Sequence, residues 1–205
     1  MIKQVFLPAV FITAIIGMGF TKKNIHGDGI YIVNTEKSTI GWKGQKLTGS
    51  HFGTIKLKRG SVKMSNHLLE SGTFEIDMAT INDTDMTGEW KGKLEGHLKS
   101  VDFFATDKFP LAKFDVTGGG PLQADTNGNN YFIKGNLTIK GITNEIEFNA
   151  TLKINESSFT AVANITIDRT KWGIKYNSKS FFEDIGDKLI YDDIELNINI
   201  VGDLQ

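Results

Sequence analysis

The chain of 205 residues contains no cysteine. Disulfides, thiolate metal sites, a cysteine nucleophile and lipidation at an N-terminal cysteine are therefore excluded. An excess of charge of one sign is also lacking, because 23 basic residues stand against 24 acidic ones. Without a basic surplus or an acidic tail, the composition gives no reason to expect nucleic acid or stored cations as partners.

Motifs for catalysis and metal binding are missing as well. The histidines show none of the spacings that hold a metal ion; they are His26, His51, His67 and His97. No Ser-His-Asp arrangement or nucleophile elbow is present. The glycines at 118–120 are not followed by the Lys-Ser/Thr of a phosphate loop. We therefore expect no cofactor, no metal and no catalytic residues.

The first 23 residues resemble a secretory signal peptide. Lys3 precedes an uncharged, largely apolar run at 5–20, which is shorter than the ~20 apolar residues that cross a bilayer comfortably. Lys22 and Lys23 favour the alternative of an uncleaved N-terminal anchor, because positive charge resists translocation. Either interpretation places residues 24–205 outside the cytoplasm, in the periplasm or the extracellular space.

What the sequence does contain is alternation of apolar and polar residues. Residues 132–152 show it most clearly, with apolar positions at Ile133, Leu137 and Ile139 and, after a break at Lys140-Gly141, at Ile146, Phe148, Ala150 and Leu152. A period of two gives a strand one apolar and one polar face. Two such strands joined by a short turn that contains glycine predict a β-hairpin.

The same alternation recurs along the chain. Further strands are predicted at 30–34, 39–47, 52–59, 61–66, 72–81, 110–116, 159–167 and 194–200, with a bend at Gly60 and loops at 118–121 and 125–130. Residues 89–100 instead have apolar residues three or four apart, which predicts one short helix capped by Thr87, with Trp90, Leu94, His97, Leu98 and Val101 on one face. The fold class is therefore all-β, an antiparallel barrel of about eight strands with one α-helix.

Several ordered motifs resemble those of the YceI-like family. They are HLKSVDFF at 97–104, KFPLAKF at 108–114, GNLTIKGITNEIEF at 135–148, IDRTKWGI at 167–174 and IYDDIELNINI at 190–200. The resemblance covers residues 30–201. It implies a lipocalin-like barrel whose apolar tunnel binds a long isoprenoid chain, such as a polyprenyl quinone or lipid carrier, in an exported protein that is not an enzyme. Two positions depart from the family's pattern: Glu95-Gly96 replace an Arg-Asp pair, and Trp172 replaces a phenylalanine.

Alternation and the resemblance together select candidate ligand-binding residues. The inward-facing apolar candidates are Trp42, Phe74, Ile76, Phe103, Phe104, Phe114, Ile133, Phe148 and Phe159. Each of them has simple core packing as its alternative, because cavities and cores use the same residue types. His97 is either a hydrogen-bonded structural residue or a contact to a ligand headgroup. Arg169 with Trp172 is either a plug at the barrel end or a holder of a ligand oxygen.

Two other functions stay open at this point. A barrel hydrolase or isomerase would use His97 or the carboxylates Asp83, Asp85 and Glu89, although such a cluster is more often solvated beside a helix N-terminus. A packed structural or interaction protein would have no cavity. The expected partner is an apolar lipid, and both membrane contact during loading and release and a homodimer are left open.

Overall fold

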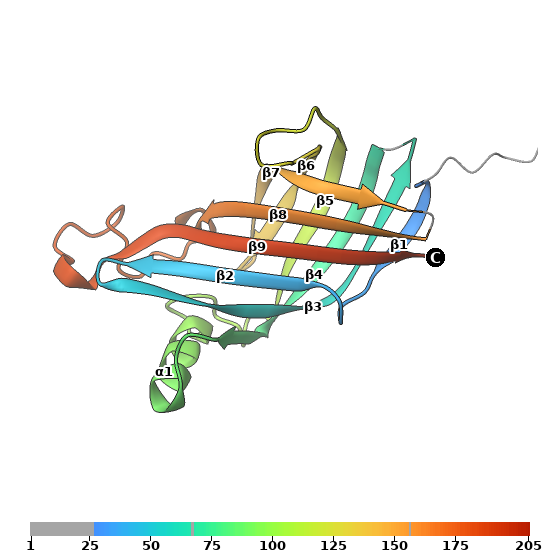
Figure 1. Cartoon of the computed structure of the whole chain (residues 1–205). Helices are drawn as coiled ribbons and strands as arrows, with labels where there is room; N and C mark the ends of the chain where they lie inside the picture. Colours follow the sequence, from blue (N-terminus) through green and yellow to red (C-terminus); the bar gives the residue numbers. More distant parts are fainter. Residues whose placement is uncertain (1–26, 67, 156) are drawn as a thin grey trace, which may run out of the picture.

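The computed structural model describes residues 27–66, 68–155 and 157–205, and antiparallel strands dominate this part of the chain (Figure 1). The N-terminal signal or anchor expected at 1–23 lies outside the described residues. The strands are β1 (Gly29–Val33), β2 (Thr39–Lys46), β3 (Gly49–Ser65), β4 (Leu68–Asp83), β5 (Leu111–Pro121), β6 (Tyr131–Ile139), β7 (Ile142–Ile154), β8 (Ser158–Asp168) and β9 (Ile190–Leu204).

Helices are few in the described ranges. The α-helix α1 (Gly88–Lys99) follows β4, and two short 3-10 helices, η1 (Arg169–Trp172) and η2 (Gly186–Lys188), lie between β8 and β9. No helix of the described part has both the length and the apolar character needed to cross a membrane.

Strands β2 to β9 close into an eight-stranded antiparallel barrel. Their order is β3-β2-β9-β8-β7-β6-β5-β4, and β4 pairs back with β3. Strand β1 extends the same wall beyond the end of β2, since it pairs with residues 61–64 of β3 and residues 202–204 of β9. The predicted barrel with one short helix is confirmed, and closure gives each of its strands two neighbours.

The predicted hairpin is formed by β6 and β7. Ile139 pairs with Ile142, so the turn consists of Lys140 and Gly141 alone. Both turn residues have positive φ, 52° and 75°. Positive φ at both central positions is the signature of a type I′ turn, whose twist matches that of the flanking strands.

The predicted bend at Gly60 does not end a strand. Strand β3 runs through this position as one element of 17 residues. Its register with β4 shifts between Leu57 and Arg59, and this irregularity moves the apolar face from odd-numbered to even-numbered residues. A Cβ at position 60 would lie 2.8 Å from Cγ2 of Val33, so the glycine permits close packing rather than a turn.

The loop predicted at 118–121 is also wrong. These residues belong to β5, where the glycines at 118–120 pair with residues 132–134 of β6. A Cβ on Gly119 would lie 2.7 Å from the carbonyl oxygen of Phe132 and 3.2 Å from the ring of Tyr131. Position 119 therefore requires a residue without a side chain, because neighbouring residues fill the space that a Cβ would occupy.

Helix α1 has nearly the predicted bounds but a narrower apolar face. Trp90 and Val101 are 67% and 78% exposed, whereas Leu94, His97 and Leu98 line the inside of the barrel end. Thr87 stands at the N-cap without a side-chain capping bond. The apolar face is narrow because α1 packs chiefly against the end of β4. Only one stripe of the helix is covered, and no residue of α1 is fully buried.

Candidate functional site

The barrel encloses an apolar cavity of about 630 Å³. Every strand from β2 to β9 contributes side chains to its wall, and α1 contributes three more. The lining consists of the alternate, inward-facing residues, for example Phe159, Ala161, Ala163, Ile165 and Ile167 of β8. A volume of this size is typical of a site for one small or elongated organic molecule.

Aromatic rings form a continuous side of this cavity. The ring of Phe114 on β5 lies 6.3 Å from that of Phe74 on β4 and 5.8 Å from that of Phe148 on β7. Gly135 on the intervening strand β6 makes this possible, since a Cβ there would lie 2.5 Å from the Phe114 ring and 2.6 Å from the carbonyl oxygen of Asp115. The glycine therefore leaves room for an aromatic row across β4, β5 and β7.

One end of the barrel is closed by packed side chains. Tyr31 is fully buried there and meets Phe159 edge to face, with ring centroids 5.4 Å apart. The Tyr131 hydroxyl accepts a hydrogen bond from the N–H of Leu69 (2.8 Å) and donates one to the carbonyl oxygen of Gly119 (3.3 Å). These contacts tie β1, β4, β5, β6 and β8 together and make this end the floor of the cavity.

The other end carries the polar part of the lining. The turn between β2 and β3, helix α1 and the segment between η1 and β9 lie at this end (Figure 1). Polar lining residues come from these elements and from the adjoining ends of β2 and β3: Gln45, Lys46, Thr48, His51, His97, Asn177, Asp187 and Lys188. This end, which we call the mouth, therefore joins an apolar interior to a polar rim.

Most of the residues selected from the sequence lie on the cavity wall. The lining contains Trp42, Phe74, Ile76, His97, Phe103, Phe104, Phe114, Ile133, Phe148, Phe159 and Arg169. Phe103 and Phe104, which follow α1, both reach the cavity although they are adjacent in the sequence. The part of these residues in binding a ligand stays a prediction.

Trp172 is not among the lining residues. It is 1% exposed, packs in the core at the mouth end, and donates a hydrogen bond from Nε1 to the carbonyl oxygen of Leu137 (2.9 Å). In the described residues β7 and β8 pair only through residues 151–154 and 159–162, and η1 lies against β7 beyond that point. Trp172 therefore helps to close the wall where two strands do not pair, and its predicted contact with a ligand stays a prediction.

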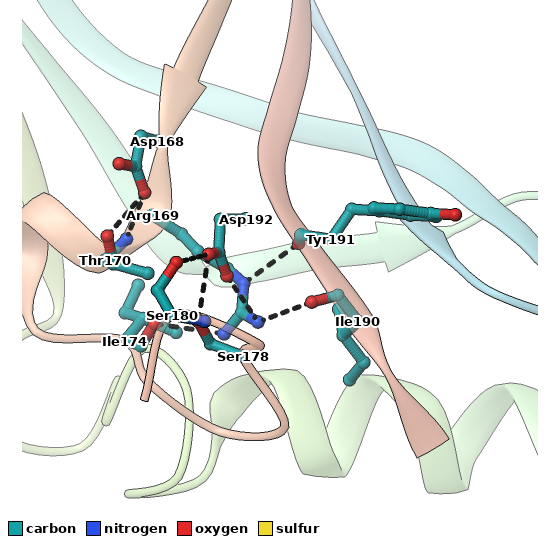
Figure 2. Close-up of polar contacts among 9 residues, drawn as sticks. All are labelled: Asp168, Arg169, Thr170, Ile174, Ser178, Ser180, Ile190, Tyr191 and Asp192. Carbon is teal, nitrogen blue, oxygen red and sulfur yellow. Dashed lines mark hydrogen bonds and ion pairs between the residues drawn. The ribbon is translucent and has the colours of Figure 1, made fainter. Parts of the chain in front are cut away.

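Arg169 is an internal anchor at the mouth (Figure 2). Its side chain is 1% exposed and donates hydrogen bonds to the carbonyl oxygens of Ile174 (3.0 Å), Ile190 (3.0 Å) and Tyr191 (3.1 Å). Nη2 also lies 3.2 Å from Oδ1 of Asp192. Because protein acceptors occupy both sides of the guanidinium, the structural interpretation of Arg169 is favoured over a contact to a ligand oxygen.

Nearby carboxylates compensate for the burial of the Arg169 guanidinium. Burial lowers its pKa, and the carboxylates of Asp192 and Asp168 oppose that effect. Asp192 in turn accepts hydrogen bonds at Oδ2 from the hydroxyls of Ser178 (2.9 Å) and Ser180 (2.7 Å). This network fixes the segment between η1 and β9, which forms one side of the mouth (Figure 2).

His97 belongs to an aromatic cluster at the mouth. Its ring lies edge-on to Phe103 and to Tyr176, with centroid separations of 5.0 Å and 4.6 Å. Tyr176 also lines the cavity, and sequence reasoning missed it. Tyr176 lies in an irregular segment after η1, so no periodic pattern marked it. The only signal available was that an aromatic residue stands two positions after the IDRTKWGI motif.

The carboxylates considered for an enzyme are divided in the structure. Glu89 lies on α1 and pairs with Lys93 at 2.7 Å, with 79% of its side chain exposed. Asp83 and Asp85 instead meet His51, a histidine for which the sequence offered no partner. Nδ1 of His51 lies 3.0 Å from Oδ2 of Asp85, and Asp83 is fully buried. Neither aspartate is among the residues that line the cavity.

Comparison with solved structures finds the same architecture. BcnA of Burkholderia cenocepacia aligns over 82% of this chain and 98% of its own, with a TM-score of 0.64 and 20% identity. A polyisoprenoid binding domain from Saccharophagus degradans, implicated in plant cell wall breakdown, aligns over 85% and 98% with a TM-score of 0.59 and 11% identity. At these identities the likeness concerns the fold.

Sequence comparison extends the likeness to a family. A UPF0312 protein of Staphylococcus aureus (strain bovine RF122 / ET3-1) is 40% identical over 91 residues, so the chain spans 47% of the length of this curated relative. The family model for the YceI-like domain matches residues 31–202. This match takes in all the barrel strands β2 to β8, η1, η2 and nearly the whole of β9. The chain therefore belongs to the YceI-like family.

Proposed function

We propose that this protein binds a long apolar lipid of the polyisoprenoid or prenyl-quinone type in its barrel and carries it without chemical change. The observation that carries the proposal is the apolar cavity of about 630 Å³ that all eight barrel strands line. A fully packed structural barrel would lack such a space. The structural neighbour described as a polyisoprenoid binding domain supports the same class of ligand.

Burial of hydrocarbon supplies the driving force. Each CH₂ group transferred from water to the cavity contributes roughly 0.8 kcal/mol. Ordering a flexible chain opposes this gain, and a membrane competes for the same groups. We therefore expect tight binding in water and release on contact with a membrane or an apolar partner.

The mouth fits the more polar end of such a ligand. The floor is closed by Tyr31, Phe159 and their neighbours, whereas the rim offers hydrogen-bonding groups such as Gln45 and Asn177. A lipid that enters tail first would keep its headgroup at this rim. Export to the periplasm or the extracellular space, expected from the N-terminal run, would place the carrier where such lipids move between membranes.

The enzymatic alternative loses support from the arrangement of its residues. Asp83 and Asp85 lie outside the cavity lining, and Glu89 faces solvent. His97 does line the cavity, but the groups packed on its ring are the aromatic Phe103 and Tyr176. The residues considered for acid–base catalysis therefore do not place a carboxylate and a histidine on the same substrate.

Native mass spectrometry of the purified full-length chain tests the proposal. We expect a co-purified lipid, or stoichiometric uptake of an added polyprenyl quinone, in the unmodified protein. Ala161→Trp, which places an indole in the cavity, is expected to abolish retention. Val162→Trp changes the adjacent residue of β8, whose side chain is 38% exposed on the outside, and is expected to leave retention intact.

Two outcomes would contradict the proposed binding of a lipid in the barrel. One is a reproducibly empty protein that also fails to take up added polyprenyl quinone. The other is equal retention by the two tryptophan variants, because binding outside the barrel would not distinguish neighbouring residues on opposite faces of β8.

A further inference from the structure

Three potential metal ligands converge where β3 begins and β4 ends. His51 on β3 and Asp83 at the end of β4 are joined by Asp85 in the loop that leads to α1. One ligand atom from each side chain lies within 4.8 Å of those of the other two. Among the described residues, no other group of three or more histidine, aspartate or glutamate side chains has its ligand atoms this close together.

One side chain of this group has a buried oxygen without a donor. Asp83 is fully buried, and its Oδ1 accepts a hydrogen bond from the N–H of Met86 (2.8 Å). Its Oδ2 is buried as well and receives no hydrogen bond from the described residues. A buried carboxylate oxygen that lacks a donor is costly, so it needs either a proton or a cation.

Backbone contacts fix the other side chains of the group. Oδ1 of Asp85 accepts the N–H of Phe52 (2.8 Å), which directs Oδ2 toward His51. The N–H of Asp83 donates to Oε1 of Glu95 on α1 (2.9 Å), which brings a third carboxylate close to the backbone of Asp83. The site thus carries several carboxylates, of which Glu95 is partly compensated by Lys91, whose Nζ lies 3.7 Å from Oε1 of Glu95.

Two occupants could compensate the two carboxylates that lie close together in this group. A proton shared between the two aspartates is one way to relieve the repulsion, and a bound cation is the other.

We propose that His51, Asp83 and Asp85 bind a divalent transition-metal ion of the Zn²⁺ or Mn²⁺ class. Imidazole nitrogen and carboxylate oxygen are ligands that such ions accept together. Two ligand atoms about 2.1 Å from one tetrahedral ion are about 3.4 Å apart. Nδ1 of His51 and Oδ2 of Asp85 are 3.0 Å apart and share a hydrogen bond, so an ion would replace its proton and move the two atoms apart by a few tenths of an ångström.

The ion would fasten α1 to the barrel. Asp83 and Asp85 stand on either side of the point where the chain leaves β4 for α1, and His51 belongs to the neighbouring strand β3. His51 also lines the mouth of the cavity, as do Leu94 and Leu98 of α1. Occupancy of the site would therefore stabilise one side of the mouth, whatever the cavity binds.

Isothermal titration of the metal-free, full-length chain without a histidine tag tests this inference. We expect ZnCl₂ or MnCl₂ to bind with one high-affinity site per chain. Removal of an outer partner of a metal site costs roughly 10–100-fold in affinity, so His51→Gln and Asp85→Asn, which remove ligands, should cost at least that. Glu89→Gln removes a nearby carboxylate that pairs with Lys93 and should leave the affinity unchanged.

A spectroscopic readout keeps the test independent of variant stability. CoCl₂ added to the unmodified protein should give visible absorption of a nitrogen- and oxygen-ligated ion, and ZnCl₂ should displace it. Absence of binding by the unmodified chain overturns the proposal, as does binding that His51→Gln leaves unchanged. In Asp83→Asn an amide N–H supplies the hydrogen bond that a shared proton would supply. An unmodified chain that binds no metal, together with an unchanged unfolding midpoint in Asp83→Asn, would therefore assign the site to a shared proton.

Discussion

Removing the guanidinium of Arg169 should destabilise the protein more than any exposed charge change. In Arg169→Met the carbonyl oxygens of Ile174, Ile190 and Tyr191 lose their donor, and Asp192 loses its ion pair. An unsatisfied buried acceptor costs about 1–3 kcal/mol, and breaking one side of a buried ion pair costs about 3–5 kcal/mol. These costs overlap because they belong to one network, so we expect a total loss of about 3–5 kcal/mol.

Urea unfolding followed by circular dichroism measures this loss as a lower midpoint at constant m-value. In thermal unfolding each kcal/mol shifts the midpoint of a domain this size by about 2–4 °C, so a drop of about 6–20 °C is expected. Arg169→Lys should recover part of the loss, since it restores the charge without the planar fork that serves several carbonyls.

Lys43→Met is the matched control for this prediction. It removes the same charge from a pair with Glu195, whose two side chains are 38% and 50% exposed. Exposed pairs contribute about 0–1 kcal/mol. Equal effects of Arg169→Met and Lys43→Met would refute the reasoning, because they would mean that burial of the guanidinium network contributes nothing to stability.

Three further predictions concern single positions. Gly135→Ala should cost about 1–3 kcal/mol by overpacking against an aromatic ring and a carbonyl oxygen, whereas Gly118→Ala, where a Cβ meets no atom within 4 Å, should be neutral or stabilising in urea unfolding. Trp172→Phe should cost about 1–3 kcal/mol by leaving the carbonyl oxygen of Leu137 unsatisfied, without changing the lipid retained in native mass spectrometry. Asp115→Asn should cost at most about 1 kcal/mol at neutral pH, because the side chain is 37% exposed, and this cost should fade as the pH falls.

The sign of the last prediction follows from the contacts of Asp115. Burial acts to raise its pKa, but hydrogen bonds from Thr73 and Lys113 outweigh it and hold the pKa below the ordinary value of 3.8. A carboxyl whose pKa is lowered by folding stabilises the protein above its unfolded pKa and loses that contribution as the pH falls through the folded one. A cost that instead grew on acidification would contradict this assignment.

The predictions for Gly135 and Trp172 can also be contradicted. Equal unfolding midpoints for Gly135→Ala and Gly118→Ala would mean that the aromatic row does not depend on the absence of a side chain at position 135. Loss of bound lipid in Trp172→Phe at unchanged stability would place Trp172 on the ligand rather than in the wall.

Much of the barrel was predictable because alternation is a local property. The β6–β7 hairpin, its turn at Lys140 and Gly141, and the inward faces of β8 and β9 all follow from a period of two. The errors occurred at glycines. Gly60 and Gly119 lie inside strands because neighbouring side chains or backbone take up the space of their missing Cβ, and that space is created by residues far away in the sequence.

The candidate site was predictable to a different degree. Apolar alternation selected side chains such as Phe74, Phe114 and Phe148, which do face the interior. It gave no sign of the group formed by His51, Asp83 and Asp85, because these residues are far apart in the sequence and meet only through β3–β4 pairing, which places Gly53 opposite Asp83. Sequence spacing detects metal ligands only when they lie on one element or one loop.

The sequence by itself determined which face of each strand turns inward, since that depends on residues two positions apart. Only the tertiary structure decided that these faces surround an open cavity instead of filling it. The width of a barrel follows from the number, tilt and register of its strands, and register depends on irregularities such as the shift near Gly60. The same apolar side chains would form a solid core in a narrower barrel, so no local pattern distinguishes a lining from a core.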